Sequence, residues 1–189
     1  MINLKYKKKK LLLIDIDGVA CNHAFSIVKK INEEYSLNFE VKDVTTWDYN
    51  FGPITFTQAV EKYYHDDNFI INMDATPGFH NFLKRIREVM LIQFATNRKK
   101  YCHLSTQSWI DKNFGPNLKV NFIDKKINFR LFDFLIDDNI DEILLVAEYG
   151  KKGFLYCRPW NENEITKKKL TKFKNIYFIK DFLEVFKII

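Results

Sequence analysis

Two acidic clusters follow apolar segments of the chain, and carboxylates in such positions could hold a metal ion. Asp15 and Asp17 follow the apolar segment 11–14, and the pair Asp137-Asp138 follows the segment 134–136. Alternation along a strand directs Asp15 and Asp17 to the same face. Two carboxylates about 4 Å apart repel by roughly 4 kcal/mol at an effective dielectric of about 20, and a bound cation turns that repulsion into coordination. The sequence therefore predicts a Mg²⁺ site that handles phosphate.

A hydroxyl and an ammonium group complete the set that phosphoryl transfer needs. Thr96 ends a predicted strand, and Lys125 precedes the second acidic cluster. A metal ion and a lysine offset charge on the phosphoryl oxygens, a hydroxyl donates a hydrogen bond to one of them, and a carboxylate can attack phosphorus. A second acid must protonate the leaving oxygen. The residue types therefore favour phosphoryl transfer.

The elements that position these residues alternate between strands and helices. Helical spacing of apolar residues predicts helices after Asn22, from Phe79 and over about 101–113. We expect strands at 11–17, 89–95, 120–123, 132–136, 153–157 and 176–179. This alternation predicts an α/β fold with a parallel sheet, in which ligands bind beyond the carboxyl ends of the strands. Asp15, Thr96 and Asp137 all fall at such ends.

A small inserted domain is expected after the first strand. Gly52-Pro53 interrupts the periodicity, aromatic residues crowd the segment 47–69, and Pro77-Gly78 marks the return to the regular pattern. We take residues 21–75 as a helical cap, and residues 1–20 and 76–189 as the core domain.

Composition excludes several other classes of protein. With 189 residues, 47% of them hydrophobic, the chain can bury one sizeable core, which excludes a disordered chain. The net charge of +6 comes largely from lysine runs at 7–10 and 167–169, for which a solvated surface is a simpler explanation than a nucleic-acid partner. Cys21, Cys102 and Cys157 fit neither a disulfide framework nor a zinc site. Without a signal-peptide core or a membrane-length apolar stretch, we expect a cytoplasmic protein with no membrane association.

The order of the motifs resembles that of the haloacid dehalogenase-like phosphatases. The shared order is D-x-D-G-V, a strand ending in Thr, a Lys, and a strand ending in Asp-Asp. A calcium-binding loop also contains D-x-D-G, but Val19 and Ala20 break its frame.

A narrower resemblance is to the 5′(3′)-deoxyribonucleotidases of that superfamily. It is carried by Asn68-Phe69, 100–102, 109–116, Asp124-Lys125 and 133–138, and Arg158-Pro159-Trp160-Asn161 is similar to a late segment of bacterial and phage relatives. The resemblance implies a Rossmann-like parallel sheet flanked by helices, a small helical cap inserted after the first strand, one Mg²⁺, and removal of phosphate from deoxynucleoside monophosphates.

The resemblance also implies a role for each motif residue. Asp15 would be the nucleophile that forms an aspartyl-phosphate, and Asp17 the general acid that then activates water as a base. Mg²⁺ would be held by the Asp15 carboxylate, the Asp17 carbonyl and Asp137, with Asp138 in a supporting position behind them. The residues expected around the phosphoryl group are Gly18, Thr96, Asn97 and Lys125.

Departures from the family pattern concern the substrate. His23 stands where the animal enzymes carry an aromatic residue that packs on the base, and Phe25 is close by. Two extra residues separate Lys125 from Asp137, so Lys126 is an alternative phosphate-binding lysine. Among the cap aromatics, Tyr64 and Trp47 are candidates for stacking on the base, although such residues more often form a small domain's core.

The leading hypothesis is a Mg²⁺-dependent phosphatase that hydrolyses (deoxy)nucleoside 5′-monophosphates through an aspartyl-phosphate. The expected substrate-binding residues are His23, Phe25, Trp47 and Tyr64, and the expected partner is a small-molecule nucleotide, with a homodimer left open. One alternative keeps the chemistry but acts on another phosphorylated small molecule or on a nucleic-acid end. The other is a catalytically silent binding module of the same fold.

Overall fold

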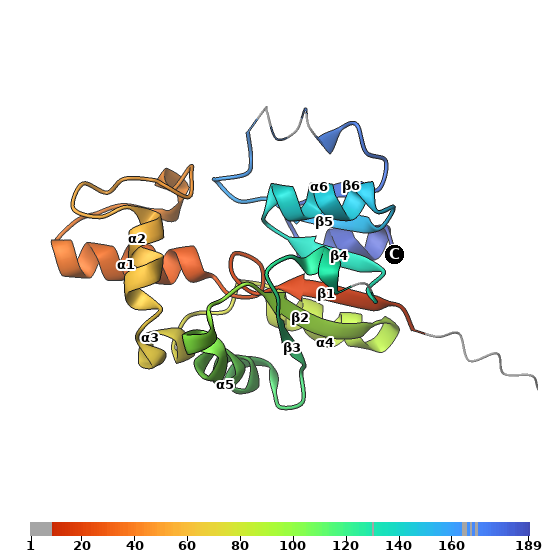
Figure 1. Ribbon diagram of the computed structural model, residues 1–189, viewed down its shortest axis with the longest axis horizontal. Coiled ribbons are helices and arrows are strands. Elements are labelled where there is room, and N and C mark those ends of the chain that lie inside the picture. Colours follow the sequence, from red (N-terminus) through yellow and green to blue (C-terminus); the bar gives the residue numbers. More distant parts are fainter. Residues whose placement is uncertain (1–8, 130, 164–165, 167, 169) are drawn as a thin grey trace, which may run out of the picture.

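A parallel sheet organises the molecule, as Figure 1 shows. The computed structural model describes residues 9–129, 131–163, 166, 168 and 170–189, so the lysine runs at 7–10 and 167–169 lie partly outside it. Within these residues the sheet has six strands, in the spatial order β3 (Val120–Phe122), β2 (Leu91–Thr96), β1 (Leu11–Asp15), β4 (Phe134–Asp137), β5 (Lys152–Tyr156) and β6 (Ile176–Ile179). The predicted α/β fold is confirmed.

Helices cover both faces of this sheet, which explains why residues 11–14 of β1 are all apolar. Leu12 and Ile14 pack in one cluster with side chains of α4 (Phe79–Val89), α5 (His103–Phe114) and the 3₁₀ segment η4 (Phe182–Lys187). Leu11 and Leu13 pack on the opposite face with α6 (Ile140–Glu148). Because successive side chains of a strand point to opposite faces, a strand between two helical layers needs apolar residues at every position.

Further helices are inserted between β1 and α4. They are α1 (His23–Tyr35), the 3₁₀ segment η1 (Val41–Asp43), α2 (Phe56–Tyr63) and α3 (Asp67–Ile71). Figure 1 shows α1 and α2 to one side of the sheet. A capping box between Thr55 and Gln58 begins α2. Among the described residues, no helix combines the length and the apolar character that crossing a membrane requires.

The two connections to this inserted segment run side by side. Cys21 and Ala75 form an antiparallel bridge. The Asn22 N–H donates to Asp74 O at 2.9 Å, and the Thr76 N–H donates to Ala20 O at 2.9 Å. We therefore keep residues 21–75 as a proposed cap.

The first strand is shorter than predicted. It ends at Asp15 because the chain turns immediately afterwards, with the Cys21 N–H donating to Ile16 O at 2.7 Å. Gly18 has a φ of +78°, a conformation that favours glycine. Asp17 therefore lies on a loop and not on the strand face expected to carry both carboxylates. The helix predicted over 101–113 begins at His103, after the 3₁₀ segment η2 (Lys100–Cys102).

Candidate active site

The two acidic clusters meet where the strand order reverses. From β1 the chain adds β2 and β3 on one side, and then β4, β5 and β6 on the other. Because β1 and β4 are parallel neighbours, their carboxyl ends lie at one edge of the sheet. Asp15 ends β1 and Asp137 ends β4. This reversal is the place where open α/β sheets bind ligands.

Three carboxylates gather at this edge. Asp15, Asp137 and Asp138 each offer an oxygen within 4.8 Å of the others, and all three residues are buried. Burial raises the pKa of Asp15 well above its usual range, and the neighbouring carboxylates add to this effect although Lys126 opposes it. Burial, followed by the charge of Asp137, raises the pKa of Asp138 to about 7. The cluster therefore resists carrying all three negative charges without a cation.

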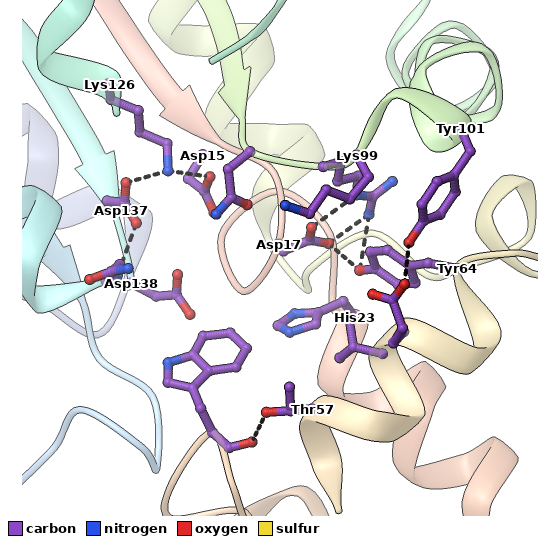
Figure 2. Close-up of a pocket in the computed structure, with 16 residues that line it drawn as sticks. Asp15, Asp17, His23, Thr57, Tyr64, Lys99, Tyr101, Lys126, Asp137 and Asp138 are labelled. Carbon is purple, nitrogen blue, oxygen red and sulfur yellow. Dashed lines mark hydrogen bonds and ion pairs between the residues drawn. The ribbon is translucent and has the colours of Figure 1, made fainter. Parts of the chain in front are cut away.

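One lysine ammonium lies between two of these carboxylates. Lys126 Nζ is 2.8 Å from Asp15 Oδ1 and 2.8 Å from Asp137 Oδ2. Dashed lines mark both contacts in Figure 2. Burial alone would lower the pKa of Lys126, but Asp137 and Asp15 outweigh burial and raise it. Three ionised carboxylates and one ammonium leave a net charge of −2. Oxygen donors with this charge fit a divalent cation such as Mg²⁺.

The lysine that lies beside the carboxylates is Lys126 and not Lys125, which the sequence favoured, and phosphate binding by Lys126 stays a prediction. Lys125 is exposed, whereas Lys126 is buried and begins the 3₁₀ segment η3 (Lys126–Asn128). The Lys126 N–H donates to Glu142 Oε2 of α6 at 2.9 Å, which anchors this segment next to the sheet edge. Adjacent side chains leave the backbone in different directions, so only one of the two lysines reaches the carboxylates.

Asp17 is held apart from this cluster. Arg98 binds both of its carboxylate oxygens, with Nε 2.9 Å from Oδ2 and Nη2 2.6 Å from Oδ1. The Tyr64 hydroxyl also donates to Asp17 Oδ1, at 2.7 Å. Burial alone would raise the pKa of Asp17, but Arg98 outweighs it and holds that pKa well below its usual range. Asp17 is therefore ionised in this arrangement.

Asp138 belongs to the carboxylate cluster itself, although the sequence suggested only a supporting position. The Trp160 Nε1–H donates to Asp138 Oδ2 at 2.8 Å, and Asn161 Nδ2 donates to the Asp138 carbonyl at 2.7 Å. A Cβ added at Gly18 would lie 2.2 Å from Asp138 Oδ2. Gly18 thus lets the loop after β1 approach Asp138, whereas binding of phosphate by its backbone stays a prediction.

Thr96 and Asn97 follow β2 at the same edge of the sheet. Thr96 is buried, and its hydroxyl oxygen accepts a hydrogen bond from the Arg98 N–H at 3.3 Å. Asn97 is exposed and lines the cavity described below. Phosphate binding by either residue stays a prediction.

A cavity of about 450 Å³ opens over the carboxylates and extends toward α1 and α2. Its volume lies in the range of ligand pockets. The residues that line it outside the proposed cap are Asp15, Asp17, Asn97, Arg98, Lys99, Tyr101, Lys126, Asp137, Asp138 and Asn139. Those from the proposed cap are His23, Trp47, Thr57, Val60, Glu61 and Tyr64. The cavity thus has a charged end and a more aromatic end.

An aromatic wall forms the second end. The His23 ring stacks on Trp47 at a centroid distance of 5.7 Å and meets Phe56 and Trp160 edge-on. Trp47 is 40% exposed, so one side of the wall is accessible. Phe25 does not line the cavity and is 44% exposed, because two residues along α1 turn it away from the side of His23. Tyr64 lines the cavity, with its hydroxyl committed to Asp17.

The His23 imidazole is almost completely buried. Neither Nδ1 nor Nε2 has a partner among the described residues. Burial lowers the pKa of His23 to about 4; Asp17 opposes this shift, while Arg98 and Arg158 add to it. The ring is therefore neutral near pH 7, and a buried nitrogen that stays without a partner costs about 1–3 kcal/mol of stability.

Replacing His23 by phenylalanine is expected to stabilise the protein. An apolar ring of similar size removes the unpaired nitrogens, and one kcal/mol corresponds to a rise in Tm of about 2–4 °C in a chain of this length. Between pH 6.5 and 4 the unfolded chain binds a proton at His23 that the folded chain does not, so wild-type stability falls as pH falls through this window.

The gain in Tm should therefore be larger near pH 5 than near pH 7.5. Thermal unfolding of the wild type and His23→Phe at both pH values measures it. A lower Tm of the variant at both pH values would mean that the nitrogens have partners in solution.

Among the residues that were not assigned from the sequence, Arg98, Arg158 and Trp160 contact site residues directly. Arg158 Nε donates to Gly18 O at 2.7 Å, and Nη2 donates to the Thr76 hydroxyl at 3.2 Å, so this residue ties both cap connections to β5. The segment 158–161 already stood out as family-like. Arg98, two residues after Thr96, carried the weaker signal of a cation next to a strand end.

Several solved structures have the same fold at low sequence identity. A HAD-family hydrolase from Deinococcus radiodurans is 10% identical, with a TM-score of 0.61 and coverage of 94% of this chain and 93% of its own. A haloacid dehalogenase-like hydrolase from Streptococcus pneumoniae is 13% identical, with a TM-score of 0.63 and coverage of 95% and 97%. A magnesium-bound HAD hydrolase from Bacillus subtilis is 12% identical, with a TM-score of 0.59 and coverage of 96% and 99%.

Sequence comparison identifies the family. None of the curated protein sequences matches the chain significantly. A family model does match residues 9–179, and it describes the 5′ nucleotidase, deoxy (pyrimidine), cytosolic type C proteins. The matched range includes Asp15, Arg98, Lys126 and Asp137. Because the match spans most of the chain, the protein belongs to this 5′-nucleotidase family of haloacid dehalogenase-like phosphatases.

Proposed function

We propose that the protein is a Mg²⁺-dependent nucleotidase that hydrolyses (deoxy)nucleoside 5′-monophosphates through an aspartyl-phosphate on Asp15. The observation that carries this proposal is the pairing, in one cavity, of the carboxylate cluster around Lys126 with the aromatic wall at His23 and Trp47. The charged end suits a phosphate group, and the aromatic end suits a base. The family's cytosolic description supports a cytoplasmic location.

The first half of the proposed reaction transfers the phosphoryl group to the enzyme. The Asp15 carboxylate attacks phosphorus, the bond from phosphorus to the 5′ oxygen breaks, and Asp17 gives a proton to that oxygen. Asp17 must therefore take up a proton before this step. The negative charge of an arriving phosphate favours such uptake, because it raises the pKa of a nearby carboxyl group. Lys126 offsets charge on the transferring group.

The second half releases phosphate. A water molecule attacks phosphorus and loses its proton to Asp17, and the bond from phosphorus to Asp15 breaks. The ionised Asp17 held by Arg98 and Tyr64 is the form suited to accept this proton. Mg²⁺, when held by Asp15, Asp137, Asp138 and the Asp17 carbonyl, would add positive charge that stabilises the transferring phosphoryl group. The magnesium-bound relative from Bacillus subtilis supports this choice of metal.

Phosphate release from a panel of substrates tests the proposed function. Deoxy- and ribonucleoside 5′-monophosphates should be hydrolysed with Mg²⁺ and not with EDTA. At low substrate concentration, the rate of hydrolysis of these nucleotides should exceed that of 2-deoxyribose 5-phosphate about tenfold or more. The reason is that one base–aromatic stack contributes about 1–3 kcal/mol to binding. Mg²⁺ should also raise the Tm of the wild type and not of Asp137→Asn.

The possible outcomes separate this function from its alternatives. Absence of nucleotide turnover with Mg²⁺ present would refute the proposal. Equal turnover of nucleotides and 2-deoxyribose 5-phosphate would favour a phosphatase for another phosphorylated small molecule.

A further inference from the structure

Arg98 makes further hydrogen bonds in addition to its ion pair with Asp17. Its guanidinium meets both oxygens of Asp17 in a bidentate pair, and its Nη1 donates to the Thr106 hydroxyl of α5 at 3.0 Å. The backbone N–H of Arg98 donates to Thr96 Oγ1. Arg98 is 5% exposed. The contact with Thr106 of α5 orients the guanidinium, and the contact with Thr96 fixes the backbone of Arg98 at the end of β2.

Tyr64 adds a contact from the proposed cap. It lies at the end of α2, and its hydroxyl donates to Asp17 Oδ1 at 2.7 Å. The guanidinium carbon of Arg98 lies 4.9 Å from the centre of the Tyr64 ring. The Asp17 carboxylate is therefore bound by Arg98, which follows β2, and by Tyr64 of the proposed cap.

The contacts with Arg98 and Tyr64 restrict the rotation of the Asp17 side chain. Asp17 lies on the loop after β1, and its carboxylate is partly exposed, with 19% of the side-chain surface accessible. A planar guanidinium that binds two carboxylate oxygens fixes their plane as well as their distance, which a lysine or a single hydrogen bond does not do. An acid–base group loses efficiency when its orientation is not held.

We propose that Arg98 is the positioning residue for Asp17, and that Tyr64 makes the orientation of Asp17 depend on the cap lying against the core. The inference rests on the proposed function, because Asp17 is the acid–base group only if the protein is the proposed phosphatase. Arg98 acts here through Asp17 and not through the substrate. Since Arg98 also lines the cavity, direct binding of phosphate is the competing explanation.

A double-mutant cycle tests this inference. The four proteins are the wild type, Arg98→Met, Asp17→Asn and the double variant, assayed with Mg²⁺ and p-nitrophenyl phosphate. The leaving group of this substrate needs no proton, so Asp17 acts on it only as the base of the second half of the reaction. Asp17→Asn should then turn over at the slow rate at which its aspartyl-phosphate reacts with water without that base. Arg98→Met should lower kcat about 10- to 100-fold, the usual effect of losing a residue that orients a reacting group, with little change in KM. In the Asp17→Asn background the same change should lower kcat less than about twofold.

Two further variants sharpen the cycle. Arg98→Lys should recover only part of the lost kcat, because an ammonium cannot form the bidentate pair. Tyr64→Phe should lower kcat about 3- to 10-fold, since it removes one hydrogen bond to Asp17 and keeps the ring under Arg98. Arg85→Met is the matched control, because Arg85 is exposed and contacts the Phe186 ring away from the cavity.

The outcomes distinguish failure of this inference from failure of the proposed function. An equal loss of kcat on Arg98→Met in both backgrounds, or a rise in KM that persists in Asp17→Asn, would overturn the positioning role while the phosphatase assignment stands. A wild type that hydrolyses neither nucleotides nor p-nitrophenyl phosphate with Mg²⁺ would instead overturn both.

Discussion

Asp15→Asn is expected to lose at least about 10⁴-fold of the phosphatase activity, because a nucleophile and the groups around it act as one unit. The amide of asparagine carries no negative charge, so its oxygen is a poor nucleophile toward phosphorus and a weaker ligand for a cation than the carboxylate oxygen. The loss should appear in kcat with every nucleotide that the wild type hydrolyses. Phosphate release over hours, with the wild type diluted to a comparable rate, measures it.

The fold should survive this change. Asp15, Asp137 and Asp138 are three buried carboxylates beside one lysine, so removing one of the charges relieves repulsion. We expect the Tm of Asp15→Asn in EDTA to equal or exceed that of the wild type. Asp111→Asn is the matched control, because Asp111 is exposed on α5 and its side chain accepts a hydrogen bond from Gln107, away from the cavity. Full activity of Asp15→Asn would exclude the aspartyl-phosphate route.

The adjacent lysines 125 and 126 give the second large effect. Lys126→Met should lower kcat/KM about 10²- to 10³-fold, the usual cost of removing one preorganised group that stabilises charge in the transition state. Lys125→Met should stay within about twofold of the wild type, because surface substitutions away from a site have small effects. Initial rates at low nucleotide concentration measure both variants.

Stability gives an independent measure of Lys126. Without its ammonium, Asp15 and Asp137 lose their nearest positive charge, so the Tm of Lys126→Met in EDTA should fall. Added Mg²⁺ should restore part of the loss, because a cation bound to the same carboxylates replaces the missing charge. Activity that depended on Lys125 and not on Lys126 would contradict the assignment of the phosphate-binding lysine.

The chemical core of the site could be predicted from local sequence. An apolar segment that ends in acidic residues predicts a buried parallel strand with carboxylates at its carboxyl end, and both β1 and β4 have this form. The order of such segments also indicated an α/β sheet and the phosphatase family, which the family match confirms. These features are local because strand formation depends on the pattern of apolar residues within one segment.

The residues that surround the carboxylate cluster are brought there by contacts between distant segments of the chain. Arg98 meets Asp17 across 81 positions of the sequence, and Trp160 meets Asp138 across 22. The sequence of one loop does not indicate which residue of a distant loop its side chains will contact. A contact between distant segments also affects β1, which was predicted to extend through Asp17 and ends two residues earlier. The turn at Gly18 that follows it packs against Asp138.

The sequence by itself thus determined the strands, their order along the chain and the acidic residues at their ends, since these follow from short-range hydrophobic patterns. Only the tertiary structure decided that Lys126 and not Lys125 reaches the carboxylates, that Phe25 points away from the cavity, and that Tyr64 binds Asp17. Side-chain direction on a loop or at a helix end depends on what packs against it, and that packing is settled when the whole chain has folded.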